Sequence, residues 1–293
     1  MLSYKKYALF IIILVLLCTL GYGYSLAPLT SKPMKVQLLW QDKPLNCQST
    51  FTAGQEHNTW FIEQFQFFIS NIQFGSDSLG WQEVKLSETA FQTENTVLLG
   101  TKCLTTQQST TLANAGNWNI KFAENTVISE NSRIRFSLGV PFESNHLNPI
   151  SQKSPLNLPS MFWVWQTGHK FMRLELAGNN KQWLFHLGST GCQSASVMRA
   201  PKKACRYPNR FDFDIPIENN DGEQIALNID LAALLKNVSL TAVSSCQSET
   251  DSMSCQQLFS NLSLEKGRDS TANATEIFTI TKATGTGKGI TIE

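Results

Sequence analysis

Charged residues are scarce in this sequence of 293 residues, of which 16% are Asp, Glu, Lys or Arg. An average globular domain has about 25%. The formal net charge is +1, so the chain lacks the basic field that holds nucleic-acid phosphates. Asn, Gln, Ser and Thr are abundant instead, a balance typical of exported β proteins rather than of helical cytosolic enzymes. We therefore expect no nucleic-acid partner.

The sequence also lacks the motifs of common enzyme classes. It has no Gly-x-Ser-x-Gly elbow, no His-Glu-x-x-His segment and no complete glycine-rich phosphate loop in a strand-to-helix context. Clustered carboxylates are missing as well, which argues against a calcium or magnesium site. We expect a binding protein that is not an enzyme.

Residues 1–25 have the pattern of a signal peptide, in which a basic head precedes an apolar run from Tyr7 to Leu20 and small or polar residues follow. The run is shorter than the roughly 20 residues that span a bilayer, although an uncleaved anchor stays an alternative. Lipidation at Cys18 is disfavoured, because Leu17 stands where a lipoprotein signal needs a small residue. We expect export to the periplasm, the medium or the outer surface of a Gram-negative bacterium, with membrane contact only through this segment.

Six cysteines remain after the leader, and an even number in an oxidising compartment predicts disulfides. Closing a short loop has the smallest entropic cost, which favours pairing between neighbours in the sequence. The predicted pairs are Cys192–Cys205, Cys246–Cys255 and, across a long span, Cys47–Cys103. A zinc site is the alternative, but the chain has no Cys-x-x-Cys and no histidine at ligand spacing from a cysteine pair.

Short runs of β-branched and aromatic residues dominate the chain, and turn signals separate them. The Gly-Asn-Asn at 178–180 and the Asn-Asn-Asp-Gly at 219–222 mark two such turns, and we expect the second to close a hairpin. This pattern predicts an all-β fold, an antiparallel sandwich or barrel-like domain with disulfides. The expected strands cover 36–40, 60–74, 117–122, 133–140, 171–176, 183–187, 211–217, 224–229 and 277–281.

Helical signal is limited to two short segments. Asp230 is expected to cap a two-turn helix that follows the strand ending at Ile229, and residues 256–262 indicate another turn of helix. No internal repeat or long linker divides the chain, so residues 26–293 are predicted to form a single domain. We expect a functional loop at 143–160 and a flexible C-terminal tail over about 266–293.

Histidine, tryptophan and methionine concentrate between residues 138 and 210. His146 enters the long loop after a predicted strand, and His186 lies in a strand. If residues 161–165 are extended, Met161, Trp163 and Trp165 share one face between these two histidines. Two imidazoles with an optional thioether suit copper, Cu(I) especially.

A simpler interpretation stays open beside the copper site. A single histidine in a strand is usually a hydrogen-bonded structural residue, and alternate tryptophans usually belong to a core. His169 follows the tryptophans at even spacing, but Lys170 beside it suggests a strand edge, so we expect it either to hold a ligand in place without touching the metal or to face solvent. His57 lies alone in a polar run and is predicted to be on the surface.

An ordered series of motifs between residues 36 and 264 resembles the MbnP-like family, also called the metallo-mystery pair four-Cys-motif family. The series is densest over 138–210, and Cys192, Cys205, Cys246 and Cys255 resemble the family's four cysteines. Its motifs are Gly139-Val140-Pro141-Phe142, Asn145-His146, Pro155-Leu156-Asn157, Met161-Phe162-Trp163-Val164-Trp165-Gln166, Lys170-Phe171, the run at 185–192, Pro208-Asn209-Arg210 and Asp230-Leu231.

The resemblance implies an exported protein that binds one copper ion and takes part in copper acquisition or handling. It implies a partner enzyme, a diheme cytochrome peroxidase-like protein of the MbnH/MauG type, which oxidises a tryptophan to kynurenine. By motif, His146 and His186 are the implied ligands, and Trp163 or Trp165 the implied kynurenine. His169 departs from the family's pattern, where a tyrosine is expected, so a role as a third nitrogen ligand stays open. The alternative is an extracellular interaction or adhesion domain without a metal.

Overall fold

The computed structural model describes residues 33–78, 80–103, 116–123, 132–178, 180–217, 224–263 and 277–282. The predicted leader at 1–25 and the Asn-Asn-Asp-Gly turn at 219–222 lie outside these residues. Within them no helix is long and apolar enough to cross a membrane.

The larger sheet has eight antiparallel strands built around β4 (Asn58–Ser76), which pairs with five of the others. β4 is central because its middle, from Gln64 to Ser70, is buried on both faces. The remaining strands are β3 (Thr50–Ala53), β5 (Gly80–Glu83), β6 (Thr96–Lys102), β8 (Arg133–Leu138), β9 (Lys170–Gly178), β10 (Lys181–Gly188) and β11 (Phe211–Pro216). The outer β8 and β11 alternate between buried and more exposed residues, as strands with one covered face do.

The smaller sheet runs in the order β13–β12–β1–β2, and β7 also pairs with β1. Its strands are β1 (Met34–Trp40), β2 (Lys43–Pro44), β7 (Asn119–Ile120), β12 (Ile225–Asp230) and β13 (Phe278–Lys282). β1 and β12 pair in parallel. The predicted hairpin across 219–222 is wrong, because β11 pairs with β8 in the larger sheet while β12 belongs to the smaller one. The turn signal is local, whereas the apolar faces of the two strands belong to different layers.

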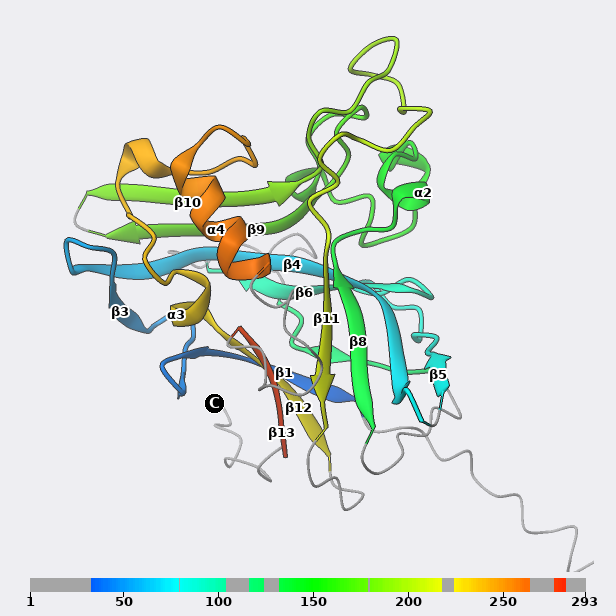
Figure 1. The fold of residues 1–293 in the computed structure, drawn as a ribbon, viewed down its shortest axis with the longest axis horizontal. Helices are drawn as coiled ribbons and strands as arrows, with labels where there is room; N and C mark the ends of the chain where they lie inside the picture. Colours follow the sequence, from blue (N-terminus) through cyan, green and yellow to red (C-terminus); the bar gives the residue numbers. More distant parts are fainter. Residues whose placement is uncertain are drawn as a thin grey trace, which may run out of the picture.

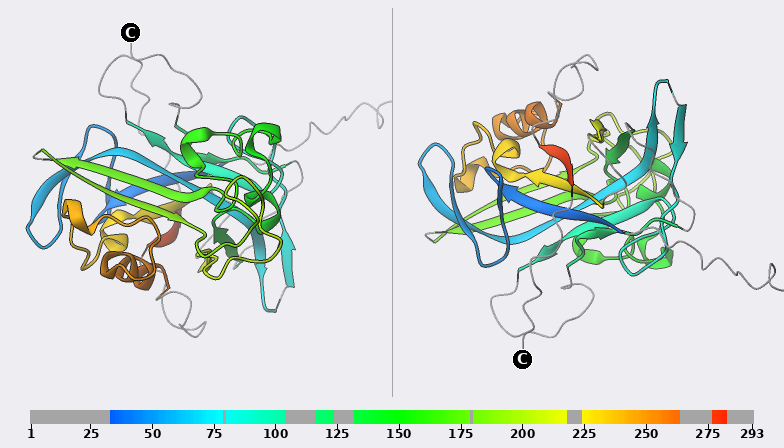
Figure 2. Two further views of the ribbon diagram at one scale, coloured as in Figure 1. Left: turned by 90° about the horizontal axis from the view of Figure 1, so that it is seen from above. Right: turned by 90° about the horizontal axis from the view of Figure 1, so that it is seen from below.

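The two sheets pack face to face, with Phe278 of β13 at the centre of the contact. Its ring centroid lies 4.6 Å from that of Phe213, 5.3 Å from Phe136 and 6.4 Å from Phe67, all in the larger sheet. β1 and β12 lie below the long β4 in Figure 1, and the views from above and below agree (Figure 2). The predicted sandwich is confirmed. Ile277 and Phe278 belong to this core, within the strand predicted at 277–281, and the rest of the tail expected to be flexible, at 266–276 and 283–293, lies outside the described residues.

Besides the strands, the described residues form short helices and three disulfides. The Asp230 side chain accepts the Ala232 N–H at 2.8 Å and caps α3 (Leu231–Leu234), as predicted, but α3 is about one turn long instead of the predicted two. α4 (Met253–Ser263) is longer than the expected turn, and η3 (Ala242–Ser244) precedes it. The three predicted disulfides are confirmed: Cys47–Cys103, Cys192–Cys205 and Cys246–Cys255.

Loops with short helical turns gather at one end of the larger sheet, at the upper right in Figure 1. They include α2 (Phe142–Asn145), η1 (Pro149–Ser151) and η2 (Pro159–Met161). The extended conformation considered for 161–165 does not run through the whole segment, since Met161 ends η2 and Trp165 lies in a tight turn, although Phe162 between them pairs with His169. Backbone bonds from Thr167 and Gly168 to the Val164 carbonyl close that turn. Met161 is completely buried.

Candidate metal centre

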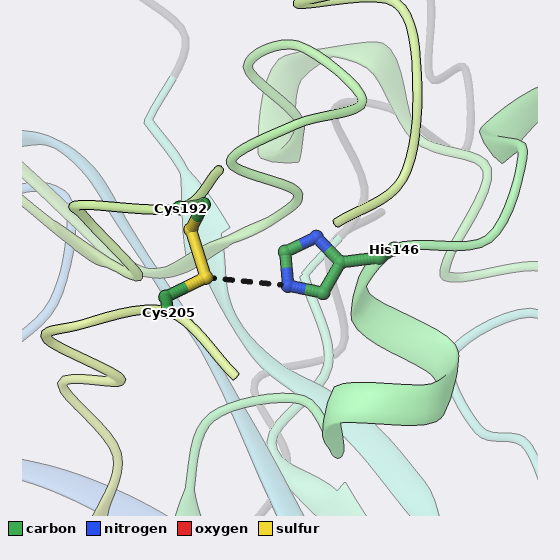
Figure 3. A group of neighbouring side chains, drawn as sticks. All are labelled: His146, Cys192 and Cys205. Carbon is green, nitrogen blue, oxygen red and sulfur yellow. Dashed lines mark hydrogen bonds between the residues drawn. A yellow bond between two sulfur atoms is a disulfide. The ribbon is translucent and has the colours of Figure 1, made fainter. Parts of the chain in front are cut away.

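His146 directly follows α2 and is buried, with 4% of its surface exposed. Its Nδ1 lies 3.4 Å from the carbonyl oxygen of Trp165, and the Trp165 indole N–H donates to the carbonyl oxygen of His146. Cys205 Sγ, in the disulfide with Cys192, lies 3.7 Å from His146 Nε2 (Figure 3). Burial lowers the pKa of His146, against the effect of the Trp165 carbonyl and with that of Arg210. His146 is therefore a neutral imidazole at pH 7.

Asn145 determines which nitrogen of His146 carries the proton. Its Oδ1 accepts the backbone N–H of His169 at 2.7 Å, and its amide nitrogen faces His146 Nε2, 3.2 Å away. An amide NH₂ group can only donate, so Nε2 is the acceptor and the ring proton is on Nδ1, toward the Trp165 carbonyl. The lone pair available to a metal is the one on Nε2, where an ion would replace the Asn145 hydrogen bond.

His169 is fully buried, so the solvent-facing alternative is wrong. Its Nε2 lies 2.9 Å from the Leu156 carbonyl oxygen and its Nδ1 lies 3.2 Å from Asn145 Oδ1. Burial lowers the pKa of His169 to about 4, despite these two contacts. Gly168 permits the close packing, because it has φ +80° and a Cβ there would lie 2.5 Å from the Asn145 carbonyl oxygen. Both ring nitrogens of His169 face protein oxygens.

His186 lies in β10 on the face opposite the core residues Phe185 and Leu187, as its alternation predicts. Its Nε2 lies 2.8 Å from Glu175 Oε1 in β9. Its Nδ1 is buried and has no hydrogen-bond partner among the residues that the structure describes. In the neutral ring the carboxylate accepts the Nε2–H, which puts the lone pair on Nδ1. A buried acceptor without a partner is uncommon in folded proteins, and a carboxylate behind a histidine is the usual arrangement around a metal-binding imidazole.

Glu175 is itself held by Arg173, whose Nε and Nη2 donate to its two oxygens at 2.7 and 3.1 Å. Burial would raise the pKa of Glu175, but hydrogen bonds from His186 and Arg173 outweigh it and lower the pKa to about 2. The side chains of Arg173 and Glu175 are each 21% exposed. The carboxylate therefore stays charged and keeps the His186 imidazole in one orientation.

Trp163 is half-buried and packs against Gly188, two residues beyond His186 on the same strand. A Cβ at Gly188 would lie 2.5 Å from Cζ3 of the indole, so glycine is required for this contact. The Lys170 ammonium lies 5.9 Å from the centre of the Trp163 ring and donates to the Ser160 carbonyl, which also accepts from Arg173. Burial and Arg173 lower the pKa of Lys170 to about 8, although Glu175 opposes them. Trp163 thus adjoins the His186 cluster, whereas Trp165 contacts His146.

The predicted residues therefore form two neighbouring clusters at the loop-bearing end of the sheet. Among the described residues, two groups of three His, Cys, Asp or Glu donors lie within 4.8 Å of one another, and His186 is in neither. One group is His146, Cys192 and Cys205; the other is Cys246, Glu249 and Cys255. Coordination of one ion by both His146 and His186 stays a prediction. His57 is exposed, as expected.

Sequence reasoning missed Asn145, Arg173 and Glu175. The signal for Glu175 was available, since the two-residue turn after Gly178 fixes the register of the β9–β10 hairpin. Counting back from that turn places His186 opposite Arg173 and diagonal to Glu175. Asn145 had no comparable signal, because its contact with His169 joins a short helix to a loop.

Comparison with known proteins shows to which family this chain is similar. A profile of the MbnP family matches residues 31–251, which include both clusters and five of the six disulfide cysteines. The chain belongs to the MbnP family. Among solved structures, MbnP from Methylosinus trichosporium superposes with a TM-score of 0.66 at 18% identity, covering 86% of this chain and 98% of that one. At this identity the likeness shows a shared fold. A search of curated proteins finds no match.

The MbnP family match confirms the resemblance drawn from the motif series. It ends at residue 251, so α4 and β13 lie beyond it, although Phe278 of β13 completes the core.

Proposed function

We propose that this chain is an exported copper-binding protein, active in the periplasm or at the cell surface, that takes part in copper acquisition or handling and is not itself an enzyme. Three disulfides support an oxidising compartment. Imidazole nitrogens suit Cu(I) better than a hard cation, since oxygen donors are the ligands that calcium and magnesium prefer.

The observation that carries the proposal is the unpartnered Nδ1 of His186. The nitrogen is buried in a side chain with 7% of its surface exposed, and Glu175 holds the opposite nitrogen. A bound ion would satisfy this acceptor. His146 supplies the second ligand through Nε2, whose lone pair is fixed by Asn145. Copper here would be held by two neutral imidazoles.

The third ligand in this proposal comes from an oxidised tryptophan. An intact indole N–H is only a donor, whereas opening the ring to kynurenine gives an amine and carbonyl groups with lone pairs. A diheme peroxidase-like partner of the MbnH/MauG type would carry out this oxidation. Trp163 and Trp165 are both half-buried; Trp165 contacts His146, and Trp163 packs against Gly188, two residues from His186, which supports either as the candidate.

Metal stoichiometry tests the ligands. We expect His146→Ala and His186→Ala each to lose copper relative to the wild-type chain. His57→Asn is the matched control, because His57 is exposed and asparagine tolerates its φ of 50°. Unchanged copper binding in both alanine variants would remove these residues from the site.

Mass spectrometry tests the modification. Peptides covering 154–170, from protein made together with its natural partner, should gain about 4 Da at one tryptophan, since conversion to kynurenine is a covalent change in mass. Copper binding should be weaker in protein made without the partner. Unmodified tryptophans in fully copper-loaded protein would refute the third ligand while leaving the histidines in place.

A metal-free interaction domain is the second candidate, and exposed apolar side chains at the same end of the molecule favour it. Ile150, Met198 and Val197 are 91%, 64% and 54% exposed, and large apolar side chains at a surface often mark an interface. Partner binding that is the same with copper removed, and that is lost in Met198→Asp, would support this function instead.

A further inference from the structure

The sulfur atoms of Cys192 and Cys205 lie beside the imidazole of His146. The proposed two-histidine site does not use these sulfur atoms. Donor atoms of His146, Cys192 and Cys205 all lie within 4.8 Å of one another, and Figure 3 shows the imidazole directed at the disulfide. Thiolate and imidazole are donors that Cu(I) prefers. In the disulfide the sulfurs are not thiolates, so the oxidised chain offers only the imidazole here.

The backbone around the two cysteines is held by bonds that do not depend on the disulfide. Thr190 and Tyr207 exchange both backbone hydrogen bonds, at 2.9 and 3.1 Å, and Arg206 N–H donates to the Gly191 carbonyl at 3.3 Å. These residues directly flank Cys192 and Cys205. Ser189 Oγ adds a bond to the Pro208 carbonyl at 2.9 Å. Two thiols formed here would therefore stay close to each other and to His146.

A reducing agent can reach this bond from one side. Cys192 is half-buried and the segment it starts is largely exposed, whereas Cys205 is buried against His146. An incoming thiolate would attack Cys192 Sγ, and Cys205 would leave as a thiolate. The second thiol of a dithiol reductant then attacks the mixed disulfide and frees Cys192. The reductant ends as a disulfide, and its two protons pass to the cysteines.

We propose that reduction of Cys192–Cys205 by a dithiol creates a second copper site, in which both thiolates and His146 Nε2 bind one Cu(I) ion. Binding releases the two thiol protons and forms two copper–sulfur bonds and one copper–nitrogen bond. His186 takes no part. Because His146 belongs to both ligand sets, the oxidation state of the disulfide determines whether that imidazole is offered to a nitrogen-only site or to a sulfur-rich one.

The other sulfur-containing group lacks this chemistry. Cys246 and Cys255 are completely buried, and their third neighbour is the exposed carboxylate of Glu249. Carboxylate oxygen suits harder cations than Cu(I). This pair therefore gives a matched control for the effect of reducing a disulfide near a titratable group.

The test is a Cu(I) competition titration of the full chain against a bicinchoninate chelator, before and after anaerobic treatment with a dithiol that is then removed. Because His146 is shared with the proposed nitrogen site, we expect reduction to give wild-type protein a gain in Cu(I) affinity for one equivalent, up to the affinity typical of thiolate sites. Cys192→Ser/Cys205→Ser should lose that gain. Cys246→Ser/Cys255→Ser should keep it, as should His186→Ala, even though His186→Ala empties the proposed nitrogen site.

His146→Ala tests the imidazole, and its reduced form should bind Cu(I) at least about tenfold more weakly, a loss of one ligand. X-ray absorption spectroscopy of copper bound to reduced wild-type protein does not depend on the folding of a variant. It should show both sulfur and nitrogen ligands on the copper. An equal gain in Cys192→Ser/Cys205→Ser, or no sulfur neighbour in wild-type protein whose free thiols are verified by alkylation, would overturn the proposal. If oxidised His186→Ala loses copper while the reduced variant keeps the gain, the result concerns the proposed two-histidine site and leaves the thiolate site in place.

Discussion

Replacing Glu175 by glutamine tests whether the carboxylate orients His186 for metal binding. Glutamine keeps the shape but removes the charge, and its NH₂ group can face His186 Nε2. The imidazole proton would then move to Nδ1, which is the nitrogen proposed to bind copper. Removing a carboxylate behind a metal-binding histidine typically weakens metal affinity by about 10- to 100-fold, or roughly 1.4 to 2.7 kcal/mol.

The substitution should also lower the free energy of unfolding, because Arg173 loses the charge that faces it. The Arg173–Glu175 bonds are 2.7 and 3.1 Å long and both side chains are 21% exposed. A hydrogen bond to a charged group contributes about 1.5 to 3 kcal/mol, and partial solvent screening favours the lower end of that range.

Two measurements separate these effects. Cu(I) competition titration gives the affinity, and ¹⁵N NMR of the His186 ring reports which nitrogen carries the proton in the metal-free chain. Glu143→Gln is the control, since Glu143 is exposed on α2, and it should change neither. If Glu175→Gln binds copper like the wild-type chain while the ring proton stays on Nε2, the carboxylate has no orienting role.

Three further predictions concern Gly188, His169 and two of the disulfides. Gly188→Ala places a Cβ 2.5 Å from the Trp163 ring and 2.8 Å from the His169 carbonyl, so it should lower the free energy of unfolding by about 1 to 3 kcal/mol and alter tryptophan fluorescence; an unchanged spectrum and stability would contradict that packing. His169 has its pKa lowered from 6.5 to about 4, so below pH 6.5 the unfolded chain binds a proton that the folded chain does not. Stability is then fully present above pH 6.5 and falls by up to about 3 kcal/mol as the pH drops to 4, and chemical denaturation of His169→Gln should show a smaller decline over this interval. Loss of Cys47–Cys103, with a sequence separation of 56, should destabilise the chain more than loss of Cys246–Cys255, with a separation of 9, by roughly 4 against 2.6 kcal/mol; thermal unfolding of the two serine pairs that reversed this order would show that native-state strain outweighs loop entropy.

Nine of the thirteen described strands and two of the three disulfide pairs were predictable because their signals are local, whereas β2, β3, β5 and β6 were missed and Cys47–Cys103 was the pair that remained. Alternation of apolar and polar residues marks β8 and β11 without reference to any partner, and short loops between cysteines favour their own closure. The motif series also identified the family and the region of the site. The hairpin predicted at 219–222 was wrong. β11 and β12 follow each other in the sequence and were expected to pair, but they belong to different sheets.

The side chains around the site depended on tertiary structure. Periodicity placed His186 on the outer face of its strand, but only the register of β9 against β10 brings Glu175 to its Nε2 and leaves Nδ1 without a partner. His169 was predicted either to support the metal ligands or to face solvent, and only the structure shows that Asn145 and Leu156 enclose it. The sequence alone determined which elements form, because backbone preference and burial pattern act over a few residues. Which nitrogen of each imidazole carries the proton was decided by groups that only folding brings within hydrogen-bond distance.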